Sequence, residues 1–327
     1  MIFTAALMAS LEPSGHWQEA RAIGLDEVVA RSFAVTTPER AELLFAAGSL
    51  TAFQGRTEPA QALLEEAVHL ARKVDDRRIL ARALVRLAWV CLVRGENRDA
   101  SIALGEEGVG LARELDDPWV LAETTNDLAE VFGDISHSSR AVALLQESLQ
   151  LRRSIAYVPG IAASLSNLGW QALLGEDYGT AITHLEESLE LARRLEQRPL
   201  MLMIQDNLAV ALLLDGDPVA AAPLFRENLR VCREMDDKRV AEEVLIGLAG
   251  VAGAQRDWRR AAWLAGAAAA LAAQLELSPT DVTPRIHARY LSAARQALGE
   301  ETYDQAYERG RLASFDEAVV YALEAGA

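Results

Sequence analysis

Small and apolar residues recur along the chain with a period near forty residues. One column holds small residues at steps of 40 or 41 positions: Ala20, Ala60, Ser101, Ala141, Ala181, Ala221 and Ala261. A second column in the same register holds Leu7, Ala47, Leu87, Leu128, Leu168, Leu208 and Leu248. Because two columns keep one register, the pattern predicts a structural unit repeated along the chain.

Each unit is predicted to be two helices joined by a short loop. Turn residues separate the columns at 95–97, 176–178 and 216–218. The second helix is amphipathic, because Leu185, Leu189 and Ala192 recur at three- and four-residue spacing while glutamates fill the other face. Acidic or polar pairs recur where one unit leads into the next: Asp75–Asp76, Asp116–Asp117, Glu196–Gln197 and Asp236–Asp237. We expect these pairs to be loop residues and not a cation site, because no unit supplies several converging oxygens.

The repeat predicts an all-α helical-repeat superhelix, an α-solenoid of about seven helix pairs over residues 1–275, without a sheet. No single unit can bury its own apolar stripe, so stacked neighbours would form the core and curve around a concave wall. After Leu275 the period stops, and Ser278–Pro279 is expected to break the chain. Residues 276–327 are predicted to be capping helices. Thr283 and Pro284 would be cap and first residue of a helix whose apolar face is Ile286, Tyr290, Leu291, Ala294 and Leu298, and Ser314 to Glu317 reads as a capping box.

The columns resemble the tetratricopeptide repeat, which places Leu-Gly in the first helix and small and bulky apolar residues in the second. Leu168-Gly169, Ala181 and Leu185 match this spacing, and Tyr178 and Trp258 stand where the family often has an aromatic residue. The resemblance spans about residues 1–275. The unit is about six residues longer than the standard repeat and lacks its closing proline, which longer helices would explain.

The C-terminal part carries a more specific resemblance. Segments 260–267, 298–301, 310–311 and 314–323 look like the end of the repeat arm of bacterial signal-transduction ATPases with numerous domains, which include MalT-like and AfsR-like activators and LuxR-type relatives. In that family an ATPase module precedes the arm and a helix-turn-helix often follows it. The resemblance therefore implies a sensor arm without those two modules, serving an output module in the same or another chain.

Composition narrows the possible partners. The chain is 51% hydrophobic and 24% charged, which is enough to build a core, and its net charge of −16 disfavours direct binding to nucleic acid. The apolar segment 261–273 is too short to span a membrane, and no signal peptide is expected at the N-terminus. Cys91 and Cys232 lie far apart in helical patterns, so we expect no disulfide and a cytoplasmic location.

The sequence predicts no enzyme and no cofactor. It has no G-x-x-x-x-G-K-[ST] phosphate loop and no G-x-S-x-G motif. The histidines are scattered without metal-ligand spacing: His16, His69, His137, His184 and His287. Glutamate pairs such as Glu65–Glu66, Glu106–Glu107 and Glu186–Glu187 are expected on a solvated face, because adjacent helical residues point about 100° apart.

One face of each first helix is predicted to line the concave wall. It holds the residues five, two and one before the column leucine and two after it. These residues are Arg82, Val85, Arg86 and Trp89; Glu123, Asn126, Asp127 and Glu130; Ala163, Ser166, Asn167 and Trp170; and Met203, Asp206, Asn207 and Val210. Amides, acids and two tryptophans suit a groove for an extended peptide or a small polar ligand.

A structural role for the same residues is the alternative. Asn167 and Asn207 would then bond to helix backbone, and Trp89 and Trp170 would pack between repeats. Arg82 and Arg86 would pair with Glu123 and Asp127 across a repeat boundary.

Three classes of function are open from the sequence. The first is a non-enzymatic sensor or protein-interaction arm that binds an inducer, a peptide or a protein for a regulatory output. Peptide-pheromone receptors, with repeats of similar length and groove asparagines, make a small peptide a credible ligand. The second class is a stand-alone adaptor, and the third is an enzyme with a site assembled across repeats.

Overall fold

The computed structural model describes residues 37–133, 139–196, 198–277 and 282–324, and all the regular structure in these ranges is helical. This confirms the predicted all-α fold of repeated helix pairs. The predicted first pair, with its column residues Leu7 and Ala20, lies outside the described residues. The chain divides into two compact units, residues 1–171 with 190–201 and residues 172–189 with 202–327.

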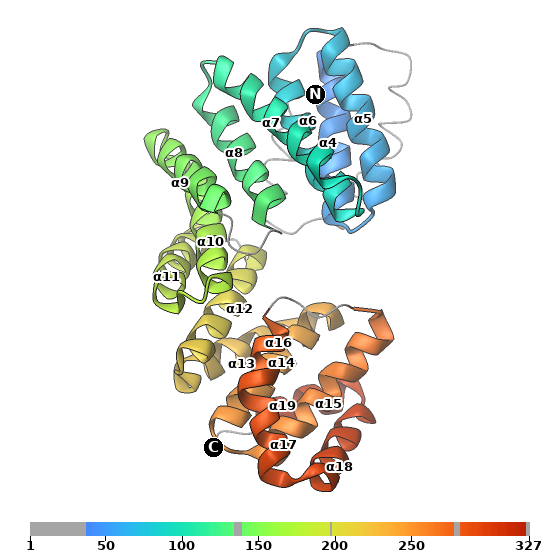
Figure 1. Ribbon diagram of the computed structural model, residues 1–327, viewed down its shortest axis with the longest axis vertical. Helices are drawn as coiled ribbons and strands as arrows, with labels where there is room; N and C mark the ends of the chain where they lie inside the picture. Colours follow the sequence, from blue (N-terminus) through green and yellow to red (C-terminus); the bar gives the residue numbers. More distant parts are fainter. Residues whose placement is uncertain (1–36, 134–138, 197, 278–281, 325–327) are drawn as a thin grey trace. The chain divides into compact units, whose positions relative to one another are not determined.

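The repeat region contains first and second helices in strict alternation (Figure 1). The first helices are α4 (Pro38–Phe53), α6 (Arg77–Val93), α8 (Pro118–Gly133), α10 (Val158–Leu174), α12 (Arg198–Asp215) and α14 (Lys238–Ala254). The second helices are α5 (Thr57–Lys73), α7 (Arg98–Glu114), α9 (Ser139–Ser154), α11 (Tyr178–Arg194), α13 (Pro218–Met235) and α15 (Trp258–Leu275). Each has 16 to 18 residues, which is about four and a half to five turns.

The acidic pairs end one helix and begin the next. Asp75 and Asp236 adopt the left-handed backbone conformation that commonly ends a helix. The carboxylates of Asp76 and Asp237 then accept a hydrogen bond from the backbone N–H of the third residue of the following helix, as N-caps do. The predicted loop position of these pairs is confirmed, with Gln197 outside the described residues.

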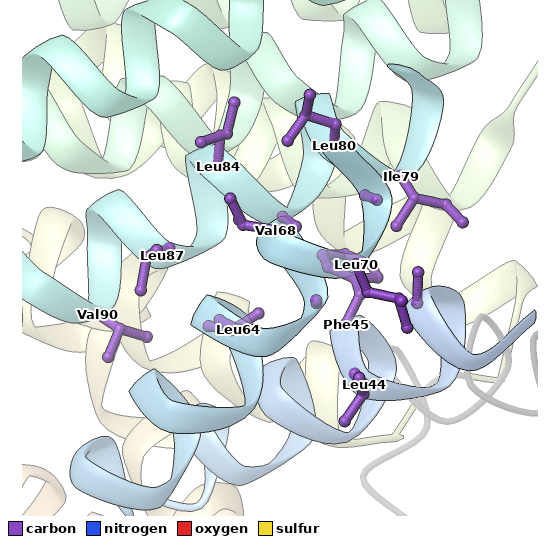
Figure 2. Packing of buried hydrophobic residues seen from close by; sticks show 14 of the residues in the cluster. Leu44, Phe45, Leu64, Val68, Leu70, Ile79, Leu80, Leu84, Leu87 and Val90 are labelled. Atoms are coloured by element: carbon purple, nitrogen blue, oxygen red, sulfur yellow. The ribbon is translucent and has the colours of Figure 1, made fainter. Parts of the chain in front are cut away.

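Both repeat columns lie in the core. Every described member of the small-residue column is at most 2% exposed, and every described member of the leucine column at most 6%. Within the first unit the leucines and valines of α4, α5 and α6 interlock (Figure 2). A Cβ atom on Gly48 would lie 2.7 Å from Leu64, so a larger residue here would force Leu64 or the two helices to shift.

The capping helices follow in the second unit. They are α16 (Thr283–Ile286), the π-helical turn η1 (His287–Leu291), α17 (Ser292–Leu298), α18 (Glu300–Arg311) and α19 (Phe315–Glu324). The predicted helix start is wrong by one position: Val282 is the N-cap and Thr283 the first helical residue, so Pro284 fills the second position. The predicted apolar face is buried at four of its five members and partly exposed at Leu298.

Side chains of the capping helices donate hydrogen bonds to backbone carbonyl groups at the C-terminal ends of repeat helices in this unit. Arg285 donates to the carbonyl oxygens of Leu173 and Leu174 at 2.9 and 2.7 Å. The Tyr290 hydroxyl donates to Leu213 at 2.6 Å. A guanidinium group at a helix C-terminus satisfies carbonyls that lack an intrahelical partner and complements the helix dipole.

The capping box at α19 is confirmed. Glu317 accepts from the backbone N–H of Ser314 at 2.8 Å, and Ser314 Oγ accepts from the N–H of Glu317 at 3.3 Å. The division of the chain into an array, 1–275, and a cap, 276–327, stays a prediction.

Candidate functional site

Two arginines of the predicted groove face form ion pairs between neighbouring first helices of the first unit. Arg82 lies 2.8 Å from Glu42 of α4, and Arg86 lies 2.8 Å from Asp127 of α8. The expected pairing of Arg86 with Asp127 is confirmed. The expected pairing of Arg82 with Glu123 is wrong, because Arg82 pairs with the preceding repeat and Glu123 pairs with Arg152 of α9.

Arg152 is the central polar residue of this face, and the groove pattern did not include it. Its side chain is 4% exposed. Its Nη1 atom donates to the Gly160 carbonyl and the Ser164 hydroxyl, both at 2.9 Å, and to Asn126 Oδ1 at 3.2 Å. The charge is balanced by Glu123, whose Oε1 atom lies 3.3 Å from Nη2.

A sequence signal for Arg152 exists, because the residues at the corresponding positions of the other described repeats are small. Eleven residues after the small-residue column, the other described repeats have Ala71, Ala112, Ala192, Cys232 and Ala272, and the corresponding residue of the first repeat, Arg31, lies outside the described residues. Within the described repeats, one arginine among small residues at a buried helical position indicates a polar contact built around it, since an unpaired buried charge is very costly.

The asparagines bond to side chains, not to helix backbone. Asn126 is buried, and its Oδ1 atom accepts from Asn167 Nδ2 at 3.3 Å as well as from Arg152. The Nδ2 atom of Asn126 lies 3.5 Å from Glu130. The backbone-bonding alternative for Asn167 is therefore not what the structure shows. Both asparagines belong to a network that joins α8, α9 and α10.

The two tryptophans differ. Trp89 packs against the buried clusters on both sides of α6, and its ring centroid lies 6.3 Å from that of Phe53. Trp170 is partly buried and makes no aromatic or cation–π contact with a described residue. The packing interpretation therefore suits Trp89, whereas Trp170 keeps surface for a ligand.

The residues predicted to line the groove do not all lie on one exposed face of the first helices. Val85, Ser166 and Val210 are at most 5% exposed, so they belong to the core. Met203 is 49% exposed and Ala163 is partly exposed. A first helix packs against both neighbouring first helices, and this widens its buried stripe beyond that of a simple amphipathic helix.

In the second unit the same face is acidic and incompletely paired. Asp206 is partly exposed, but its Oδ1 atom is buried without a hydrogen-bond partner. Burial, and then the charge of Glu243, raise the pKa of Asp206 to about 7. Burial and Glu243 likewise raise the pKa of Glu242 to about 7. Arg239, 3.9 Å from Glu243, lies at the exposed rim.

Asn207 lies beside Asp206 on α12. It is partly exposed, and its side chain makes no hydrogen bond to any residue that the structure describes. The backbone-bonding alternative thus finds no support at Asn207. Its amide can donate to and accept from an external group.

Asp206→Asn is expected to raise the free energy of unfolding by about 1–2 kcal/mol at pH 8. The folded-state pKa of Asp206 lies above its ordinary value of 3.8, so its contribution to stability is present at low pH and is lost as the pH rises through about 7. The gain from the substitution should therefore shrink as the pH falls from 8 to 5. Urea titrations of both proteins across this range measure it, and a constant difference would contradict the assignment.

The described residues hold no group of side chains typical of metal binding or of an activated thiol. Within the described ranges, no three His, Cys, Asp or Glu side chains could hold a metal ion. Burial raises the pKa of both the Cys91 and the Cys232 thiol to about 12, which is opposite to an activated nucleophile. His16 and His137 lie outside the described residues. No helix in the described part is long and apolar enough to cross a membrane.

Two open clefts lie on the capping helices of the second unit, and neither is lined by a predicted groove residue. One, of about 570 Å³, is lined by Trp263, Leu312, Val320 and Tyr321 among others. The other, of about 740 Å³, is lined by His287, Arg295, Glu300 and Tyr303 among others.

Two family models match parts of the chain. Residues 160–234 match the model described as Tetratricopeptide repeat, and residues 39–96 match that described as Anaphase-promoting complex subunit 5. A comparison with the sequences of characterised proteins finds no significant match.

Several solved structures share the fold. A Rap protein complexed with Competence and Sporulation Factor aligns with a TM-score of 0.63 and 13% identity over 98% of this chain and 96% of that chain. The Signal Transduction ATPase with Numerous Domains (STAND) protein PH0952 from Pyrococcus horikoshii has a tetratricopeptide repeat sensor. It aligns with a TM-score of 0.57 and 12% identity over 92% of this chain and 46% of that chain. BtubC (BKLC) from P. vanneervenii aligns with a TM-score of 0.58 and 20% identity over 68% of this chain and 94% of that chain.

At these identities the structural similarities establish the fold alone. The repeat columns, the helix pairs and the family match agree with one another. Over its described residues the chain is an all-helical, tetratricopeptide-like repeat protein, with a tetratricopeptide repeat segment at residues 160–234.

Proposed function

We propose that the chain is a non-enzymatic, ligand-sensing and protein-interaction module that binds an extended peptide or a small polar ligand on its first-helix face. Its role would be that of a cytoplasmic sensor arm in a bacterial regulator, with an ATPase or DNA-binding output in the same or another chain. The alignment of most of this chain with under half of the STAND protein supports an arm that works beside other modules. The Rap protein, similar along most of its length, was solved with Competence and Sporulation Factor.

The observation that carries the proposal is the set of unsatisfied polar groups on the first-helix face. Asp206 has a buried oxygen without a partner, and the amide of Asn207 has none among the described residues. Most buried polar groups in folded proteins are hydrogen-bonded, so groups left open on one face indicate a ligand surface. The net charge of −16 supports a protein, peptide or small-molecule partner over nucleic acid.

A stand-alone adaptor is the second candidate, because the same face would hold a segment of another protein without any output module. The gene's surroundings discriminate between the two. A reading frame that extends upstream into a phosphate loop or downstream into a helix-turn-helix favours the sensor arm.

A peptide screen tests the proposal. A pooled library of hexapeptides, screened by thermal shift, should contain binders that stabilise the chain, by about 2.7 kcal/mol at a concentration of 100 times Kd. Asn207→Ala, in the second unit, should weaken the selected peptide at least tenfold at little cost in stability. Trp170→Ala, in the first unit, should cost far less than the 3–5 kcal/mol of a tryptophan removed from a core.

Trp89→Ala is the matched control, because Trp89 packs against buried clusters on both sides. It should lower the melting temperature strongly and leave the affinity of the folded fraction near that of the parent. A library without binders, or an Asn207→Ala protein with unchanged affinity, would contradict the proposed groove.

A further inference from the structure

The repeat allows Arg152 in the first unit to be compared with its counterpart in the second. Arg152 lies 26 residues after Asn126, the acceptor it contacts on α8. In the second unit, Cys232 of α13 likewise stands 26 residues after Asp206 of α12. The second unit thus has an acid in place of the asparagine and a small thiol in place of the arginine.

A hydrogen bond common to the two repeats shows that these positions correspond in space. Ser148 of α9 donates to the carbonyl of Ala122 at 2.7 Å, and Asn228 of α13 donates to the carbonyl of Leu202 at 3.0 Å. Both bonds join residues 26 positions apart, and the donors Ser148 and Asn228 stand four residues before Arg152 and Cys232, respectively. The helices of each pair therefore share one register, and Cys232 occupies the place of Arg152.

Among the described residues of the second unit, Cys232 and not an arginine or lysine stands at the position equivalent to Arg152. Asp206 is close enough to Cys232 for its charge to raise the pKa of the thiol. Asn228 is 1% exposed, and its Oδ1 atom, like Asp206 Oδ1, is buried without a hydrogen-bond partner. The Asn228 side chain is close enough to Asp206 to oppose, in part, the rise in the pKa of that carboxyl. Glu243 adds a second carboxylate, which is close enough to affect the pKa of Asp206.

We propose that the Asp206 site receives a guanidinium group from the ligand, which takes the role that Arg152 performs within the first unit. This inference rests on the proposed function and specifies its ligand. A guanidinium group has five donors and pairs with carboxylate and amide oxygens, which are the groups left open here. An organic cation fits better than a metal ion, because no three ligating groups among the described residues converge on one point.

Matched peptides test the inference. The probes are a hexapeptide pool with arginine fixed at one position and the same pool with citrulline, which has nearly the same shape without the charge. The arginine pool should bind at least tenfold more tightly, and raising NaCl from 50 mM to 1 M should weaken it. Agmatine, a free guanidinium compound, distinguishes the sources: tight binding of agmatine alone indicates a small-molecule ligand, and preference for the peptide pool a peptide.

Variants locate the effect. Asp206→Asn should weaken arginine-pool binding at least tenfold, whereas Asp215→Asn, the same change at an exposed position of α12, should not. Cys232→Arg, which places an internal guanidinium at the site, should also abolish binding, with Cys232→Ser as its control. Circular dichroism checks that each variant folds, and if Cys232→Arg does not, Glu243→Gln replaces it.

The outcomes separate the two proposals. Equal affinity for the arginine and citrulline pools, or unchanged affinity in Asp206→Asn, overturns the guanidinium site while peptide binding itself stands. If neither pool, nor agmatine, nor the unrestricted library binds, the proposed function falls together with this inference.

Discussion

Replacing Arg152 with alanine is expected to lower the free energy of unfolding of the first unit by about 3 kcal/mol. The substitution removes the donor to the Gly160 carbonyl and to Ser164, and it leaves the Glu123 carboxylate without its cation. It also leaves a cavity between α8, α9 and α10. Glu123 is 23% exposed, and water reaching it reduces the cost below that of a fully buried ion pair.

Arg194→Ala is the control for this experiment. Arg194 pairs with Glu190 one helical turn away, and both side chains are well exposed. Exposed pairs of this kind contribute about 0–1 kcal/mol. Urea denaturation monitored by circular dichroism should therefore separate the two variants clearly. Similar losses in both would show that the Arg152 network contributes little to stability.

Gly310→Ala is expected to destabilise the second unit by about 3 kcal/mol, because α15 and α18 cross with their backbones in contact. A Cβ atom on Gly310 would lie 1.9 Å from the carbonyl oxygen of Trp263, and one on Gly266 would lie 2.0 Å from that of Tyr307. These neighbours are backbone atoms that no rotamer change can move. The two helices would have to separate.

Gly179→Ala supplies the comparison, since no atom lies within 4 Å of its Cβ position in α11. There alanine should be neutral or stabilise the helix by up to about 1 kcal/mol. Thermal and urea unfolding of both variants test the expectation. A Gly310→Ala protein as stable as the parent would mean that the two helices are not in backbone contact.

The sequence predicted the repeat well because the repeat is periodic. The columns to which Ala181 and Leu168 belong recur at fixed spacing, because close helix crossings allow little choice of residue at these positions. The capping box at Ser314 was predictable for a similar reason, since its two hydrogen bonds depend on residues three apart.

The polar network was predicted less well, because partners in it come from different repeats. Arg82 has acids at comparable positions before and after it, and packing, not spacing, selects Glu42. Arg152 stands in the last turn of α9, where arginine is common on the surface, so its burial has no local signal. The comparison of equivalent positions across repeats is the signal that would have found it.

The resemblance to the STAND arm included Gly266 and Gly310 without a physical reason for either. The structure provides one, because the two glycines allow the last repeat helix and a capping helix to touch. The resemblance contained no information about which groove groups remain open. That depends on what the neighbouring helices leave unpaired, as at Asp206.

Hydrogen–deuterium exchange with a selected library hexapeptide tests the central claim, that the first-helix face binds the ligand, most directly. Bound peptide is predicted to slow exchange in the second unit, in α12 around Asp206 and Asn207 and in the part of α13 around Asn228, with little change around the clefts of the capping helices. Protection confined to the clefts of the capping helices, around Trp263 and Tyr303, would contradict the claim and place the ligand elsewhere.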